Sequence, residues 1–157
     1  MKVRRLARSV ALQALYEIDC TQHPPAQVLQ YRLEETPLPE PAAKFARWLI
    51  YGVLRHRAIL DAYIQRYAPE WPLEQVAIVD RNILRMALYE LTQDSRTPIK
   101  VAINEAIELG KMFGSDSTPR FVNGVLGALV PLRQEIARRI QENSPPPNRP
   151  KQPKRKE

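Results

Sequence analysis

The chain has 157 residues and a net charge of +7, a length that suits one domain or two small subdomains with a shared core. Its single cysteine, Cys20, excludes an internal disulfide, and two histidines (His23 and His56) are too few for a Cys/His zinc cluster, so a reducing cytoplasm fits best. No stretch reaches the roughly 18 apolar residues of a membrane span and no apolar run follows the basic N-terminus, so we expect an unexported cytoplasmic protein.

The positive charge is concentrated at the two ends of the chain. Residues 1–8 carry four basic side chains and residues 145–157 carry five against one glutamate, so the residues between them are nearly neutral. Localised positive charge indicates a polyanionic partner, with nucleic acid favoured over anionic lipid. The basic, proline-rich tail, residues 143–157, is expected to be disordered, and simple solubility explains its charge equally well.

Residues 3–18 form the clearest amphipathic helix. Its adjoining polar face carries Arg4, Arg5, Arg8 and Tyr16, and guanidinium groups beside an aromatic ring suit unpaired RNA bases. The alternative is an ordinary solvated face with Tyr16 half-buried. The apolar stripe that is predicted to pack inward repeats at helical spacing and consists of Val3, Leu6, Ala7, Val10, Ala11, Ala14, Leu15 and Ile18.

Two further helical segments follow in the N-terminal half. Residues 26–35 form a short helix between proline-rich breaks, and the helical pattern resumes over residues 42–67. Within it, Gly52 permits close packing or a bend. The run Arg55-His56-Arg57 is predicted to be a solvated basic corner rather than an anion-binding or catalytic site, because no acid or nucleophile lies at a recognisable spacing.

A proline-bounded connector at residues 68–73, which carries Trp71, divides an N-terminal helical bundle (about residues 1–68) from a C-terminal one (about residues 73–142). The next helix, residues 80–91, is apolar around most of its circumference, with only a polar stripe of Arg81, Asn82, Arg85 and Tyr89. Such a helix should run through the middle of a helical domain, which places Leu88 deep in the core. Asp80 either caps this helix or lies inside a longer one that begins after Pro72.

Residues 101–113 and the segment after Pro119 are the last predicted helices. The first offers Val101, Ala102, Ala106, Ile107 and Leu109 to the core and ends at Gly114 as a C′ residue. The second should be kinked or divided by Pro131 before it continues toward Glu142. Asn104 and Asn123 lie inside these apolar patterns, and a structural role, either joining the two last helices or satisfying a turn, is favoured over contact with a ligand.

Four blocks of the sequence resemble the NusB family of transcription antitermination proteins. The first is RRLARSVALQALYEID (residues 4–19), and the others are VDRNILRMALYEL (79–91), PIKVAINEAIELGKMFG (98–114) and RFVNGVLGAL (120–129). The blocks occur in the family's order and at its spacing. Two features depart from the family pattern without altering the assignment: the basic tail, and Gly110 where the family more often has alanine.

The resemblance implies one all-α domain over residues 1–142, with two small helical bundles packed around a shared central helix and no enzymatic activity, cofactor or metal. It implies binding to the single-stranded boxA element of nascent ribosomal RNA together with ribosomal protein NusE, in a complex that helps RNA polymerase resist termination. Family members occur as monomers and as homodimers, so the oligomeric state stays open. Carried over by position, the RNA-binding residues are Lys2, Arg4, Arg5, Arg8, Tyr16, Tyr67 and Phe121, and the NusE-facing residues are Asp80 and Ser117.

Two other classes of protein share features of this sequence. The N-terminal RNA-binding module of rRNA cytosine methyltransferases shares the NEA and FVN signatures, but the chain is too short for the α/β domain that should follow. None of its five glycines forms a GxGxxG cofactor loop either. A helical protein-interaction module without RNA binding would use the arginine face as a homodimer contact or leave it bare. Binding of RNA separates these alternatives.

Overall fold

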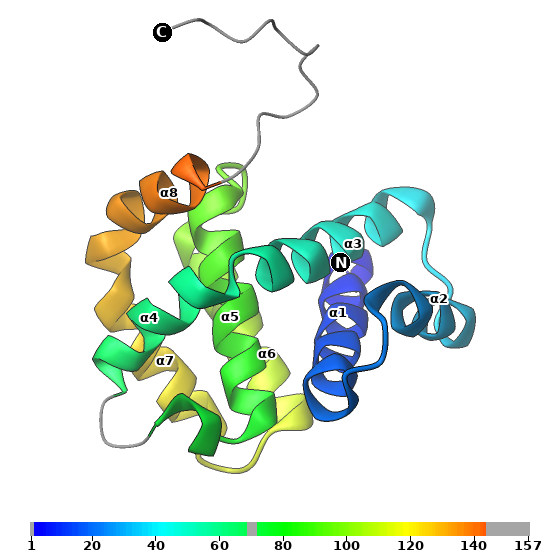
Figure 1. The fold of residues 1–157 in the computed structure, drawn as a ribbon, viewed down its shortest axis with the longest axis horizontal. Coiled ribbons are helices and arrows are strands. Elements are labelled where there is room, and N and C mark those ends of the chain that lie inside the picture. The colour runs from blue at the N-terminus through cyan, green and yellow to red at the C-terminus, as the bar shows by residue number, and fades with distance from the viewer. Residues whose placement is uncertain (1, 69–71, 144–157) are drawn as a thin grey trace, which may run out of the picture.

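The structure, a computed structural model, describes residues 2–68 and 72–143, without the side chain of Lys2. The predictions for Trp71 and for the tail from residue 144 lie outside this part of the chain. All the regular elements that it describes are helices, which confirms the all-α prediction (Figure 1). In chain order they are α1 (Lys2–Thr21), α2 (Pro25–Glu35), α3 (Glu40–Arg55), α4 (Arg57–Tyr67), the 3-10 helix η1 (Leu73–Gln75), α5 (Ile78–Gln93), α6 (Ile99–Phe113), α7 (Thr118–Leu129), the 3-10 helix η2 (Val130–Leu132) and α8 (Arg133–Glu142).

Helix α5 occupies the centre of the molecule and contacts α1, α3, α4, α6, α7 and α8 (Figure 1). Its apolar side chains from Ile83 to Leu91 are buried, Leu84 and Leu88 completely. A helix that is apolar nearly all round has no side suited to water, so neighbours surround it and the prediction of a central helix is confirmed. The polar stripe is also largely covered, since Asn82 and Arg85 are buried.

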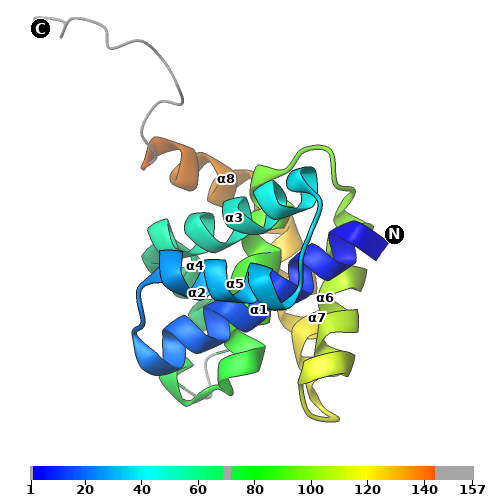
Figure 2. The same ribbon diagram turned by 90° about the vertical axis from the view of Figure 1, so that its right-hand side faces the viewer.

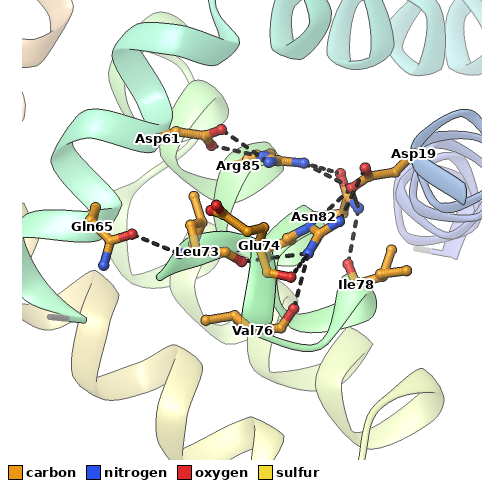
Figure 3. Close-up of polar contacts among 10 residues, drawn as sticks. Asp19, Asp61, Gln65, Leu73, Glu74, Val76, Ile78, Asn82 and Arg85 are labelled. Carbon is orange, nitrogen blue, oxygen red and sulfur yellow. Dashed lines mark hydrogen bonds and ion pairs between the residues drawn. The ribbon is translucent and has the colours of Figure 1, made fainter. Parts of the chain in front are cut away.

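The polar side chains of α5 bond carboxylates of α1 and α4 (Figure 3). Arg85 donates to Asp61 of α4 (Nε to Oδ1, 2.7 Å) and to Asp19 of α1 (Nη1 to Oδ2, 3.0 Å). Asp19 also accepts from Arg81 (Nε, 3.1 Å) and Asn82 (Nδ2, 3.0 Å). Burial raises the pKa of Asp19, but these donors and the two arginine charges outweigh it and lower the pKa to about 2. This network, called the Asp19 network below, ties α1, α4 and α5 together.

Prolines determine where several helices begin and end. Pro25 starts α2, while Pro41 and Pro119 stand in the first turns of α3 and α7, where a missing N–H leaves no helical hydrogen bond unmade. Pro131 lies in η2 and separates α7 from α8, which confirms the predicted division. The helical pattern of residues 42–67 consists of two helices, α3 and α4, which meet at His56.

The corner between α3 and α4 packs on Tyr89 of α5. His56 is buried with its ring 6.1 Å from the Tyr89 ring, and burial lowers its pKa. The predicted solvated corner is therefore wrong for His56, because α5 covers it, although Arg55 and Arg57 are exposed. A Cβ at Gly52 would lie 2.1 Å from the Tyr89 ring. The glycine thus allows the close packing of α3 on α5.

Three residues predicted to face the core are exposed: Val3 and Leu6 in α1 and Val101 in α6. The first turns of α1 lie at the edge of the molecule (Figure 2), so their apolar side chains have no helix above them. Val101 lines the same surface hollow as Arg5 instead of entering the core. The buried part of the α1 stripe comprises Ala7, Val10, Ala11, Ala14, Leu15 and Ile18, to which the structure adds Leu12.

One hydrophobic cluster runs from α1 to α8 through both predicted bundles. Helices α1, α2 and α3 pack together on one side of α5, whereas α4 packs chiefly against α5, α7 and α8 (Figure 1). By its contacts, α4 therefore lies with the C-terminal helices. No helix in the described ranges has both the length and the apolar character needed to cross a membrane.

Candidate nucleic-acid interface

The first turns of α1 lie beside the α5–α6 loop and the beginning of α6 (Figure 2). Three adjoining hollows are found there. The hollow beside α3 and the hollow beside α1 share Arg4 and Arg96. The hollow beside α1 and the hollow beside α6 share Arg5, Val101 and Glu105, so the three hollows form a continuous surface. The α3 hollow (about 640 Å³) is lined by Arg4, Pro41, Lys44, Phe45, Trp48, Gln93, Asp94, Ser95 and Arg96. The α1 hollow (about 400 Å³) is lined by Arg4, Arg5, Arg8, Arg96, Thr97, Pro98, Val101 and Glu105. The α6 hollow (about 430 Å³) is lined by Arg5, Val101, Asn104, Glu105, Ile107, Glu108 and Lys111.

Arg4 and Arg5 present partly open guanidinium groups to these hollows, with 44% and 45% of their side chains exposed. Arg5 makes a two-pronged pair with Glu105 (Nε to Oε1, 3.0 Å; Nη2 to Oε2, 2.9 Å), and these bonds lower the pKa of Glu105. Arg4 reaches Asp94 at 3.4 Å. The acids hold both arginines in position and leave each with an exposed side that suits phosphate.

Arg8 is buried, with 5% of its surface exposed, so the prediction that it shares an open polar face with Arg4 and Arg5, away from the core, is wrong. It pairs with the equally buried Glu90 of α5 (Nε to Oε1, 2.9 Å), and its Nη1 lies 3.7 Å from Glu105. The face of α1 that carries Arg8 packs against α5, which the spacing of α1 alone does not show. Arg8 helps to fix α1 on α5, beside the two exposed arginines.

The predicted aromatic residues lie in different places. Tyr16 is exposed on α1, about 18 Å along the helix from Arg4 at 1.5 Å per residue. Tyr67 ends α4 and is exposed, while Phe121 is half-buried in the first turns of α7. Figure 1 places the end of α4 across α5 from the start of α1. The structure thus brings Arg4, Arg5 and Arg8 together but keeps Tyr67 and Phe121 apart from them.

Residues far away in sequence complete the basic surface and were not predicted. Arg96, whose side chain is 86% exposed, comes from the α5–α6 loop, and Lys44 and Trp48 come from α3. Lys44 and Trp48 are four residues apart, a spacing that places a cation and an aromatic ring on one helix face. That spacing is the one sign of these surface residues in the sequence, and only the fold brings this face of α3 beside α1.

The residues predicted for the NusE face meet where α5 begins beside the α6–α7 loop. Asp80 is buried and accepts a hydrogen bond from Oγ1 of Thr118 at 2.8 Å. Burial raises the pKa of Asp80, and the bond from Thr118 opposes that rise. Ser117 is exposed, with its hydroxyl 3.3 Å from that of Ser115. Ser117 is therefore accessible at this corner, while Asp80 supports the loop from beneath.

Two predictions about helix ends at this corner are wrong, the cap at Asp80 and the C′ conformation of Gly114. Helix α5 begins at Ile78, separate from η1, so Asp80 does not cap it but lies in the first turn of a helix that begins after Pro72. Gly114 follows α6 with φ −98°, not in the left-handed conformation of a C′ glycine. A Cβ at Gly114 would lie 2.4 Å from Oγ1 of Thr118. The close approach of Thr118, whose hydroxyl bonds Asp80, requires the glycine.

Asn104 and Asn123 are both exposed, so the prediction that they join the last two helices is wrong. Each occupies the outward side of its helix, beside buried neighbours such as Ala106 and Val125. Asn104 lines the α6 hollow, next to Arg5 and Glu105. Within residues 2–68 and 72–143, no group of three or more His, Cys, Asp or Glu side chains is placed to hold a metal ion.

Both the sequence and the fold are similar to those of known proteins. The NusB family matches residues 5–131. The transcription antitermination protein NusB of Roseiflexus castenholzii is 48% identical over 135 residues, which cover 85% of this chain and 95% of that protein. Among solved structures, NusB of T. maritima is 34% identical with a TM-score of 0.78 and covers 88% of this chain and 96% of its own. A crystal structure of the antitermination factors NusB and NusE in complex with double-stranded RNA is 26% identical with a TM-score of 0.76, over 83% of this chain and 98% of that one. The chain belongs to the NusB family.

Proposed function

We propose that this protein is an RNA-binding transcription antitermination factor of the cytoplasm without enzymatic activity. With a NusE partner it binds the boxA element of nascent ribosomal RNA and helps RNA polymerase resist termination. The observation that carries the proposal is the basic surface of Arg4, Arg5 and Arg96 around connected hollows, in a chain whose fold is similar to a NusB bound to NusE and RNA.

The mechanism is assembly rather than covalent chemistry. Phosphates of the RNA approach the open sides of Arg4 and Arg5, which Asp94 and Glu105 hold in place. Exposed aromatic rings, such as Tyr16, offer stacking surfaces to splayed bases. NusE docks at the corner formed by Asp80 and Ser117, and the two proteins together present a composite surface to the RNA.

The direct test is a binding titration with and without NusE. The RNAs are a single-stranded boxA oligomer, a scrambled oligomer of the same composition and a duplex of the boxA sequence, because the related NusB–NusE crystal structure holds double-stranded RNA. We expect salt-dependent binding that favours single-stranded boxA and is strengthened by NusE. Equal affinity for boxA and scrambled RNA, with or without NusE, would contradict the proposal.

The same titration decides between the alternatives. A helical protein-interaction module would bind NusE or another copy of the chain and show no affinity for any of the RNAs. An RNA-binding module of the methyltransferase type would bind structured RNA without help from NusE. Sedimentation of the free protein gives its oligomeric state in the same buffer and completes the comparison.

A further inference from the structure

The α3 hollow, the largest of the three around α1, contains a stack of aromatic and guanidinium groups. Cζ of Arg4 lies 3.8 Å from the centre of the Phe45 ring, and Asp94 holds the same guanidinium from the side. One face of this group therefore covers Phe45. With 44% of the side chain exposed, the opposite face is open to the hollow. An open guanidinium plane is a stacking surface for a nucleic-acid base.

The aromatic part of this stack is fixed by its own neighbours. The rings of Phe45 and Trp48 lie 5.8 Å apart at 21°, and Trp48 packs on Tyr89 of α5 at 4.8 Å. Phe45 and Tyr89 are buried, whereas Trp48 is half-buried and lines the hollow. The hollow thus offers an ordered platform that needs little rearrangement before it binds a planar group.

The rim of the α3 hollow is positively charged. Lys44 and Arg96 are exposed at its edge, and Arg4 adds a third cation, against the single carboxylate of Asp94. That carboxylate already accepts from the Thr97 hydroxyl (2.8 Å) and the Arg96 backbone N–H (3.0 Å). The remaining positive charge suits phosphates on either side of a bound base.

We propose that the α3 hollow is a nucleotide subsite that takes one unpaired RNA base against Arg4 and Trp48, with its flanking phosphates on Lys44 and Arg96. The inference rests on the proposed RNA-binding function and names a place on α3 that the predicted RNA-binding residues do not include. The volume of about 640 Å³ is within the range of small-molecule sites, roughly 300–1,000 Å³.

The subsite lies on the path of a strand bound by α1. Arg4 and Arg96 line both the α3 hollow and the α1 hollow, so a strand held by Arg5 continues into the α3 hollow without leaving the basic surface. Every base has a stacking face, so the subsite adds affinity with little preference for base identity. An acidic peptide would use the cations but not the platform of stacked planar groups, which favours RNA as the occupant.

Trp48 itself reports occupancy. The chain has two tryptophans, Trp48 and Trp71, so the variant Trp71→Phe leaves Trp48 as the single fluorophore. Titration with single-stranded RNA is expected to quench its fluorescence to saturation. A set of RNAs that each carry one abasic nucleotide should contain a member that binds but no longer quenches. Saturated binding of unmodified RNA without a change in Trp48 fluorescence would overturn the proposal.

Substitutions supply the second measurement. Trp48→Leu keeps an apolar group on α5 but removes the stacking face, and should weaken RNA binding by about 5- to 100-fold at every base composition. Lys44→Ala alters only an exposed side chain and should lower the log–log salt slope by about 0.7. The matched controls are Tyr51→Ala and Arg57→Ala, an exposed aromatic and an exposed cation outside the three hollows. Melting curves show whether each variant is folded.

Two further arms separate the possible failures. If wild-type protein with NusE binds no RNA, the proposed function and the subsite fall together. If Arg5→Ala weakens RNA binding while Trp48→Leu and Lys44→Ala bind like the controls, the function stands and the subsite is wrong.

Quenching of Trp48 fluorescence by AMP with the affinity of the RNA would make the α3 hollow a site for a free nucleotide. Quenching by NusE alone would make it a protein contact. Either of the last two results overturns the proposal.

Discussion

Arg4, Arg5 and Arg8 belong to one sequence pattern but have different surroundings. Arg4 and Arg5 are partly exposed, whereas Arg8 lies beneath them and pairs with the buried Glu90. Solvated pairs contribute little to stability and leave the guanidinium free to change partner. A buried pair cannot lose one member without leaving an uncompensated charge. Replacement of these arginines should therefore give two distinct effects.

The variant Arg8→Ala is expected to lose about 3–5 kcal/mol of unfolding free energy, because the carboxylate of Glu90 stays buried without its partner. Urea titration measures the loss. As a control, Arg8→Leu combined with Glu90→Leu removes both charges and should recover much of the stability. If Arg8→Ala unfolds at the wild-type urea concentration, the buried pair has no structural importance and Arg8 is free for RNA.

The double variant Arg4→Ala/Arg5→Ala should remain folded, because both side chains lie on the solvent side of α1. Each lost phosphate contact should reduce the slope of log affinity against log salt by about 0.7 for single-stranded RNA. Binding measured between low and moderate salt gives the slope, with Arg55→Ala/Arg57→Ala as the control pair. An unchanged slope would remove Arg4 and Arg5 from the RNA-binding surface.

Among the elements, α5 has the greatest influence on stability, because six other α-helices rest on it. Leu88→Ala is expected to cost about 2–5 kcal/mol, since Leu88 is fully buried and its removal leaves a cavity that the surrounding helices cannot close. Calorimetry gives the change in melting temperature. Leu33→Ala, at a half-buried position of α2, is the control and should cost less. Equal losses in the two variants would argue against a special position for α5.

The Asp19 network predicts how the contact between α1 and α5 depends on pH. The folded pKa of Asp19, about 2, lies below the ordinary value of 3.8, so its ionised form stabilises the fold. This contribution, roughly 2 kcal/mol, is complete above pH 4 and is lost as the pH falls toward 2. The variant Asp19→Asn lacks this stabilising contribution at every pH. The unfolding free energies of the variant and the wild type should therefore converge as the pH is lowered. A constant difference down to pH 2 would contradict this prediction.

For the whole molecule, the arginine surface and the Asp80–Ser117 corner come from different parts of the chain, so their contributions should be separable. Ser117→Arg places a positive charge at an exposed position where a basic ribosomal protein is expected to dock, and should slow association with NusE. Direct RNA binding should change much less. Asp80→Asn keeps an acceptor for Thr118 and serves as the structural control. NusE binding that survives Ser117→Arg but is lost in Asp80→Asn would assign the interface to the carboxylate itself.

Periodicity predicted most of the fold because apolar spacing reports directly which side of a helix is buried. The central helix and the deep position of Leu88 follow from it, whereas the break at Pro131 follows from the missing N–H of proline. Partners distant in sequence are not encoded in local spacing. The burial of Arg8 depends on Glu90, and that of His56 depends on Tyr89. For the same reason the α3 hollow, which joins residues 4, 44 and 96, could not be predicted from any one segment.

The position of α5 in the middle of the chain also affects the order of events during synthesis on the ribosome. Asp19 and Asp61 emerge well before Arg85, which bonds both of them. Until α5 leaves the exit tunnel, α1 and α3 can pack only on each other and on α2, and the faces that they turn to α5 stay uncovered. Arrested nascent chains that end before residue 78 should therefore expose apolar surface and recruit chaperones. Those that carry the chain through α8 should fold in a single step.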